Sequence, residues 1–220
     1  GGNLKFGVHA AKPAAVTEAL RKHLPADVKV VVCGSTLAGE EEFLLDSLPP
    51  GVITILAPRH PERFNAVEKL LSQRKANVVL RSRWMDSPGP ISAGSVFLLD
   101  SIGELASVYS LADVAFVGGG IFTPGGHNPL EPAQFGVPAA MGPHYENFRA
   151  IVDLLRAADA IAVVEAAEIQ PTLHRLLADS TAAREMGERA RKVFETESGA
   201  TETAVESLLA IVEAGAGVRA

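Results

Sequence analysis

The sequence predicts an α/β fold in which helices cover both faces of a doubly wound, parallel β-sheet. Short apolar runs rich in β-branched residues alternate along the 220 residues with amphipathic stretches of helical period. The apolar runs are continuous, which is typical of parallel strands buried on both faces. We therefore expect a Rossmann-like sheet of about six strands, followed by C-terminal helices.

The expected elements follow one another along the chain. The strand-like runs lie at residues 28–33, 52–57, 78–80, 96–99, 114–117, 137–141 and 161–164. Helical spacing, as at Val16, Leu20 and Leu24, predicts helices at residues 14–24, 40–48, 61–73, 102–111, 130–134 and 146–158. The expected C-terminal helices lie at residues 167–178, 182–195 and 202–214. No linker divides the sequence, so we expect one domain over residues 1–220.

Composition argues against several functional classes. The chain has a net charge of −6 and no long run of Lys or Arg, which disfavours sequence-independent nucleic-acid binding. Cys33 is the only cysteine and lies in an apolar run, so we expect a buried thiol rather than a nucleophile. The six histidines are scattered, without metal-ligand spacing, so we expect no metal and no cofactor. No apolar run approaches the roughly 20 residues of a membrane span.

The strongest candidate site is the glycine-rich segment FVGGGIFTPGGHNPLEPAQFG, residues 116–136. It follows a strand, and ligands of doubly wound sheets bind beyond the carboxyl ends of the strands. Glycine lets backbone N–H groups approach a ligand, and a helix N-terminus favours an anion. Asn128 could cap the next helix or donate to a phosphate oxygen. Glu131 could stabilise the helix dipole or accept hydrogen bonds from a ribose.

The segment APRHPERF, residues 57–64, places charged residues after another expected strand. Arg59 could reach a phosphate or form a structural ion pair. We expect His60 to cap the next helix and Arg63 to be structural.

The segment LLDSIGEL, residues 98–105, follows a third expected strand. Asp100 or Ser101 is the expected N-cap of the next helix, with Glu104 at capping-box spacing. The functional alternative is a backbone contact from this turn to a planar base.

Several segments together resemble one family. GSTLAGEEEFLL, PRHPERF, LLDSIGELASVYSLADVAFVGGG, GGHNPLEPAQFGVP and MGPHYENF are similar, in order and spacing, to the C-terminal half of 3-deoxy-D-manno-octulosonic acid (Kdo) transferases. GNLKF, residues 2–6, resembles the segment where the two halves of those proteins join. The resemblance implies a GT-B glycosyltransferase with two Rossmann-like domains, of which this chain is the donor-binding one.

The resemblance also implies the reaction. The C-terminal domain binds the donor, CMP-Kdo, and Kdo passes with inversion to a lipid A precursor at the cytoplasmic face of the bacterial inner membrane, without a required metal. The N-terminal domain binds the acceptor and carries the carboxylate base. Because the chain starts at the domain junction, we expect no catalytic residue, acceptor domain or membrane anchor within it. It should fold alone and bind nucleotide without transferring sugar.

The resemblance assigns donor contacts to particular positions. Arg59 would contact the donor phosphate or the sugar carboxylate. Gly125, Gly126 and Asn128 would cradle the phosphate, and Glu131 would hold the ribose.

Two further assignments are implied in the same way. The turn of Ser101, Ile102 and Gly103 would flank the cytosine, and Ser35 would lie in a loop that faces the cleft. The chain departs from the family pattern at Gly120, where a serine is common. Two alternatives stay open: a GT-B protein that uses a UDP-sugar, such as a hexosamine transferase or epimerase, and a non-catalytic nucleotide-binding domain.

Overall fold

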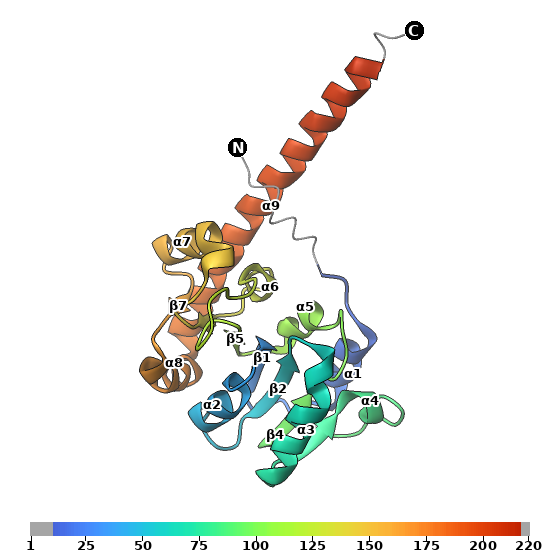
Figure 1. Cartoon of the computed structure of the whole chain (residues 1–220), viewed down its shortest axis with the longest axis vertical. Coiled ribbons are helices and arrows are strands. Elements are labelled where there is room, and N and C mark those ends of the chain that lie inside the picture. The colour runs from blue at the N-terminus through green and yellow to red at the C-terminus, as the bar shows by residue number, and fades with distance from the viewer. Residues whose placement is uncertain (1–10, 217–220) are drawn as a thin grey trace.

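The computed structural model describes residues 11–216, and among these the side chains of residues 11–199. Helices and strands alternate as the sequence predicts (Figure 1). The strands in this part of the chain are β1 (Val30–Thr36), β2 (Ile53–Pro58), β3 (Asn77–Leu80), β4 (Ser95–Leu98), β5 (Val114–Val117), β6 (Ala139–Met141) and β7 (Ala162–Val163).

The helices alternate with these strands. The α-helices are α1 (Ala15–His23), α2 (Glu40–Ser47), α3 (Phe64–Gln73), α4 (Arg81–Trp84), α5 (Leu105–Val108), α6 (Leu130–Ala133), α7 (Arg149–Ala157), α8 (Ala166–Ala178) and α9 (Ser180–Ala216). Three 3₁₀ turns complete the described elements: η2 (Pro61–Arg63), η3 (Tyr109–Leu111) and η4 (Glu146–Phe148).

The strands form one parallel sheet in the order β3-β4-β2-β1-β5-β6-β7. β1 lies between β2 and β5, since Val31 pairs with Thr54 on one side and with Val114 on the other. β2, β4 and β3 therefore lie on one side of β1, with β4 between β2 and the edge strand β3, and β5, β6 and β7 extend the sheet on the other side. The carboxyl ends of β1 and β5 are the switch point at which such sheets bind ligands.

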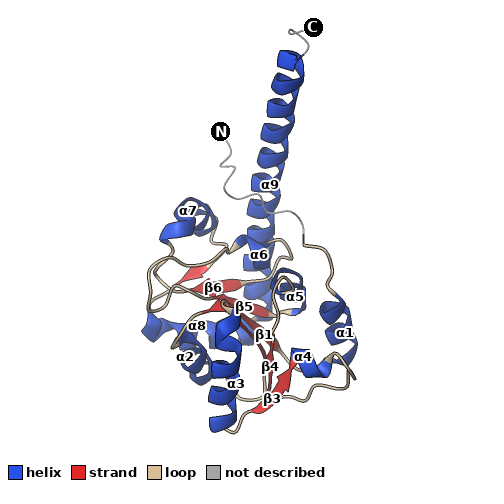
Figure 2. Ribbon diagram, turned by 45° about the vertical axis from the view of Figure 1, so that its right-hand side comes forward, coloured by secondary structure: helices blue, strands red, loops and turns tan. Residues whose placement is uncertain are grey.

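Helices cover both faces of the sheet (Figure 2). Alternating side chains of each strand pack into the two cores beneath them. Val30 and Val32 pack on the face covered by α1, α5, α6, α7 and α9. Val31 and Cys33 pack on the opposite face, under α2, α3 and α8. Burial raises the pKa of the Cys33 thiol to about 12, so the expectation of a buried, unreactive cysteine is confirmed. The sequence prediction of a doubly wound sheet is also confirmed.

Some boundaries differ from the prediction. The described sheet has seven strands rather than about six, because the two-residue β7 also pairs with β6. The two helices expected at residues 182–195 and 202–214 are one helix, α9, because the glycine between them does not end it. Figure 1 shows the far part of α9 extending away from the sheet.

Candidate functional site

Five loops lie side by side along the carboxyl edge of the sheet. They follow β4, β2, β1, β5 and β6, in that spatial order. β4 and β5 are three strand spacings apart, which is about 14 Å. The turn that holds Ser101, the segment that holds Arg59 and the glycine-rich segment therefore share one edge, as the sequence predicts.

Arg59 follows β2 and lies near two residues of the glycine-rich segment. Burial raises the pKa of the Glu131 carboxyl, and the positive charge of Arg59 partly offsets this rise. Burial, with the nearby charges of Arg59 and His60, lowers the pKa of His127 to about 4, so its ring is neutral at pH 7. Within the described residues, the Arg59 guanidinium has no hydrogen bond or ion pair, which leaves a cation near the half-buried carboxyl of Glu131.

Arg63 has the structural role that the sequence predicts. Its Nη2 lies 2.8 Å from Oε2 of Glu41, whose side chain is 1% exposed. The other oxygen of Glu41 accepts a hydrogen bond from Thr36 Oγ1 at 3.0 Å. His60 occupies the N-cap position of η2, as expected, but its side chain makes no capping bond.

A buried carboxylate that sequence reasoning missed holds the start of the glycine-rich segment. Oε2 of Glu40 accepts hydrogen bonds from the N–H groups of Gly119 at 2.7 Å and Leu37 at 3.0 Å. Oε1 accepts one from the N–H of Ile121 at 2.9 Å. Glu40 thus joins the loops after β1 and β5. The sequence signal was the run of three glutamates that opens the helix after GSTLAG.

Close packing between neighbouring loops explains why this segment contains glycine at several positions. A Cβ on Gly120 would lie 2.4 Å from the carbonyl oxygen of His144, and one on Gly126 would lie 2.7 Å from the same oxygen. A Cβ on Gly142 would lie 2.1 Å from the Gly120 carbonyl oxygen. The loop after β6 therefore lies directly against the bare backbone of the loop after β5.

The N–H groups of Gly125 and Gly126 are already hydrogen-bonded. That of Gly126 donates to the Gly119 carbonyl at 2.9 Å, and that of Gly125 donates to Oε2 of Glu146 at 2.8 Å. These N–H groups are therefore not free to approach a ligand as the sequence suggests, because the neighbouring loop and the segment itself supply acceptors. That these glycines contact a phosphate stays a prediction.

Asn128 has the capping role expected for it, and its donation to a phosphate oxygen stays a prediction. Its Oδ1 accepts a hydrogen bond from the N–H of Leu130 at 3.0 Å, which caps α6 from one position before the N-cap, Pro129. This bond uses Oδ1 and leaves Nδ2 as the donor end of the amide. α6 has only four residues, so its dipole is weaker than the sequence suggests.

The turn after β4 is built differently from the expected capping box. α5 begins at Leu105 with Glu104 as N-cap, and the Glu104 carboxylate bonds Ser101 and, at 2.6 Å, Arg81. Asp100 caps no helix that follows it, because its carboxylate accepts hydrogen bonds from Ser82.

The rest of this turn is open to solvent. Ile102 is 64% exposed, and Gly103 adopts a φ of 87°, which L side chains rarely adopt. An apolar side chain and a tight turn thus lie at one end of the row of loops.

Ser35 does not lie in a loop, so that expectation is wrong. It belongs to β1, which extends to Thr36, and the register with β2 shifts between Gly34 and Thr36. Ser35 adopts a φ of 55° at this bulge and is 6% exposed. It lies at the switch point, since its carbonyl oxygen would be 2.8 Å from a Cβ on Gly118.

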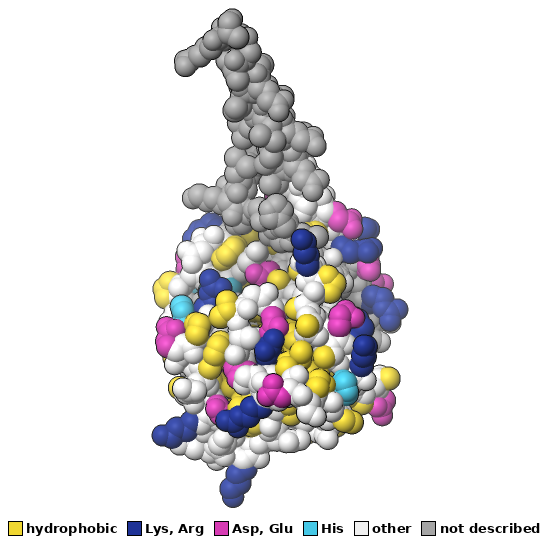
Figure 3. Space-filling model, turned by 90° about the vertical axis from the view of Figure 1, so that its right-hand side faces the viewer, with side chains coloured by type: hydrophobic (Ala, Val, Ile, Leu, Met, Phe, Trp, Pro, Cys, Tyr) yellow, Lys and Arg dark blue, Asp and Glu magenta, His cyan; other side chains and the backbone are white. Residues whose placement is uncertain are grey.

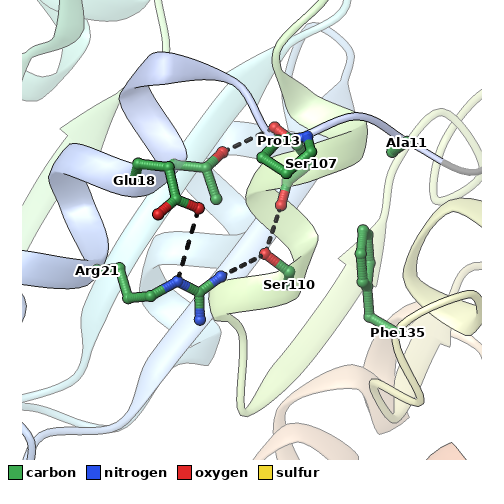
Figure 4. A pocket seen from close by; sticks show the side chains of 8 residues that line it. Ala11, Pro13, Glu18, Arg21, Ser107, Ser110 and Phe135 are labelled. Atoms are coloured by element: carbon green, nitrogen blue, oxygen red, sulfur yellow. Dashed lines mark hydrogen bonds and ion pairs between the residues drawn. The ribbon is translucent and has the colours of Figure 1, made fainter.

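Other features of the described residues do not compete with this edge. No group of His, Cys, Asp and Glu there could hold a metal ion, and none of the helices there combines the length and apolarity needed to cross a membrane. Figure 3 shows basic and acidic side chains mixed over one face. A cavity of about 290 Å³ lies between α1 and α5, where Arg21 bonds Ser110 at 3.2 Å and pairs with Glu18 (Figure 4).

Comparison with known proteins connects this geometry to a family. No model of a known protein family matches the chain. The crystal structure of the C-terminal CMP-Kdo binding domain of WaaA from Acinetobacter baumannii matches with 36% identity and a TM-score of 0.70, over 76% of this chain and 90% of that domain. The chain belongs to the Kdo transferase family.

Curated Kdo transferases support the same assignment. That of Haemophilus influenzae is 32% identical over 221 residues, which cover 96% of this chain and 51% of that protein. That of Bordetella pertussis is 31% identical over 189 residues, covering 81% of this chain and 44% of that protein. The chain therefore spans about half the length of the Kdo transferases it matches.

The fold is shared more widely among glycosyltransferases. The C-terminal domain of the glycosyltransferase LpcC from Francisella tularensis matches 89% of this chain and 97% of that domain, with a TM-score of 0.57 and 14% identity. That likeness shows the fold alone. The Kdo transferase chain described here thus has the Rossmann-like architecture of a GT-B domain, as the sequence predicts.

Proposed function

We propose that this chain is the donor-binding domain of an inverting glycosyltransferase that transfers Kdo from CMP-Kdo to a lipid A precursor in lipopolysaccharide core biosynthesis. The observation that carries the proposal is the guanidinium of Arg59, which has no acceptor within the described residues and lies near the half-buried carboxyl of Glu131. This pair lies at the switch point of a domain 36% identical to a CMP-Kdo binding domain.

The donor phosphate is the natural partner of Arg59. Nδ2 of Asn128 supplies a neutral donor from the glycine-rich segment, and the N–H of Gly125 supplies another when Glu146 moves aside. Gly126 shapes the loop, because its own N–H is used by Gly119. The sugar carboxylate is the second anionic group that Arg59 could bind.

The nucleoside occupies the rest of the row. Glu131 accepts hydrogen bonds from the ribose hydroxyls, which are neutral donors and do not repel its carboxylate. The turn of Ser101, Ile102 and Gly103 flanks the cytosine with an exposed apolar side chain. Ser35 borders the nucleotide at the end of β1 through its backbone, because its side chain is buried.

Catalysis by this domain follows from the movement of charge. When the bond between Kdo and CMP breaks, negative charge grows on the phosphate. Arg59 opposes that charge with a hydrogen bond worth about 1.5–3 kcal/mol. Because α6 is a single turn, Arg59 carries more of this stabilisation than a helix dipole does.

The other half of the reaction lies outside these residues. The acceptor site and the carboxylate base belong to the N-terminal domain of such a transferase, and the assembled enzyme works at the cytoplasmic face of the bacterial inner membrane. The chain alone should therefore bind donor nucleotide and transfer no sugar.

Calorimetric titration of the chain with CMP and with UDP tests the proposal. We expect CMP to bind and UDP to bind more weakly. A clear preference for UDP would favour a transferase or epimerase that uses a UDP-sugar. Absence of CMP binding by the folded chain would overturn the proposal.

A further inference from the structure

The loops after β5 and β6, at the carboxyl edge of the sheet, are joined by hydrogen bonds between their backbones. The N–H of His144 donates to the Gly120 carbonyl at 3.1 Å, and the N–H of Asn147 donates to the Gly125 carbonyl at 3.0 Å. One further bond differs in kind, because its acceptor is a side chain: the N–H of Gly125 donates to the carboxylate of Glu146 at 2.8 Å. That N–H therefore already binds an anion.

Glu146 is held as a carboxylate at the surface. Its side chain is 45% exposed, and Oε1 lies 3.6 Å from Nδ1 of His144. Hydrogen bonds from its own N–H and from that of Gly125 lower the pKa of its carboxyl. Its ion-pair partner among the described residues is a histidine rather than Lys or Arg. The backbone N–H groups are thus its principal stabilisers.

We infer that the carboxylate of Glu146 competes with an anionic group of the nucleotide-sugar for the N–H of Gly125. The inference rests on the proposed function, which brings a phosphate and a sugar carboxylate to this edge of the sheet. Glu146 is then a specificity-determining residue. An anionic group, either the donor phosphate or the sugar carboxylate, displaces it from Gly125, whereas a neutral group gains too little from one amide to do so.

The loop can release Glu146 without losing its shape. The backbone bonds from His144 to Gly120 and from Asn147 to Gly125 do not involve the Glu146 side chain. The direction of the Gly125 N–H is held by these bonds and by a φ of 132° that L side chains rarely adopt. The amide therefore stays in place for whichever anion occupies it.

Calorimetry of the 220-residue chain with CMP, and with cytidine as the same nucleoside lacking phosphate, tests the inference. Glu146→Gln keeps the shape of the side chain but weakens the acceptor, and Glu146→Ala removes the acceptor. We expect CMP affinity to rise in that order by about three- to tenfold, and cytidine affinity to stay unchanged.

Two more variants separate competition from simple charge repulsion. Glu146→Asp keeps the charge but shortens the side chain by one methylene, so it should also bind CMP more tightly than the native chain. Glu62→Gln neutralises a carboxylate on the same edge that is 75% exposed, and it should leave CMP affinity unchanged.

The outcomes are distinguishable. Equal or weaker CMP binding by Glu146→Gln and Glu146→Ala overturns the inference and leaves Glu146 a structural role in its loop. Native affinity in Glu146→Asp also overturns it, since long-range repulsion then suffices. If the native chain itself binds no CMP, the proposed function fails, which is a different result from either.

Discussion

The carbonyl oxygen of His144 lies where a side chain on Gly120 would begin. The His144 N–H donates to the Gly120 carbonyl at 3.1 Å, and a Cβ on Gly120 would be 2.4 Å from the His144 oxygen. The loop after β6 is therefore fitted to the bare backbone of Gly120.

Gly120→Ala should therefore destabilise the fold. Overpacking against a backbone atom typically costs about 1–3 kcal/mol, and urea unfolding followed by circular dichroism measures it. Gly89→Ala is the matched control, because a Cβ there meets nothing within 4 Å. Equal midpoints for the two variants would show that the loop after β6 shifts freely.

Glu40→Gln should lower the free energy of unfolding by about 2–4 kcal/mol. The new amide group replaces one acceptor oxygen and faces backbone N–H groups that also donate. Glu42→Gln, which loses only an exposed ion pair with Arg74, should change it by at most about 0.5 kcal/mol. Urea unfolding midpoints compare the two variants. Similar small losses of stability in both would contradict the conclusion that Glu40 holds the loops after β1 and β5 together.

Substitution of Arg59 should affect nucleotide binding, whereas substitution of Arg63 should affect stability. Arg59→Gln should lower CMP affinity about 10- to 100-fold and leave the unfolding midpoint nearly unchanged, because its guanidinium has no acceptor within the described residues. Arg63→Gln leaves the buried Glu41 carboxylate without its ion pair, which should cost about 2–3 kcal/mol of stability. Calorimetry and urea unfolding of both variants test this, and an interchange of the two effects would refute it.

Glu131→Gln should make the protein more stable at pH 7 and bind CMP about tenfold more weakly. Burial raises the pKa of this carboxyl, so the folded chain binds more protons than the unfolded chain between the two pKa values. The free energy of unfolding therefore falls as pH rises through the raised pKa.

The stability gain of Glu131→Gln should disappear below about pH 4, where the carboxyl is protonated in both states. Thermal unfolding at pH 4 and pH 7 measures this difference. If the variant is instead less stable at pH 7 and binds CMP normally, Glu131 serves the helix dipole alone.

Much of the site could be predicted because strand order brings loop ends together. Arg59 follows β2 and Glu131 follows β5, and parallel strands deliver both to one edge whatever the details of packing. The hydrogen-bond partners of the amides could not be predicted in this way. Glu40 meets Gly119 across 79 positions of sequence, and Glu146 meets Gly125 across 21.

The sequence by itself determined the doubly wound sheet, its two cores and the edge that carries the candidate residues, because apolar period and strand direction are local properties. Only the tertiary structure decided which backbone N–H groups are occupied, that Ser35 belongs to a strand, and that glycines at the site serve loop packing. Those outcomes depend on differences of a few tenths of an ångström in the distances between segments that are far apart in sequence. No local pattern in the sequence encodes such distances.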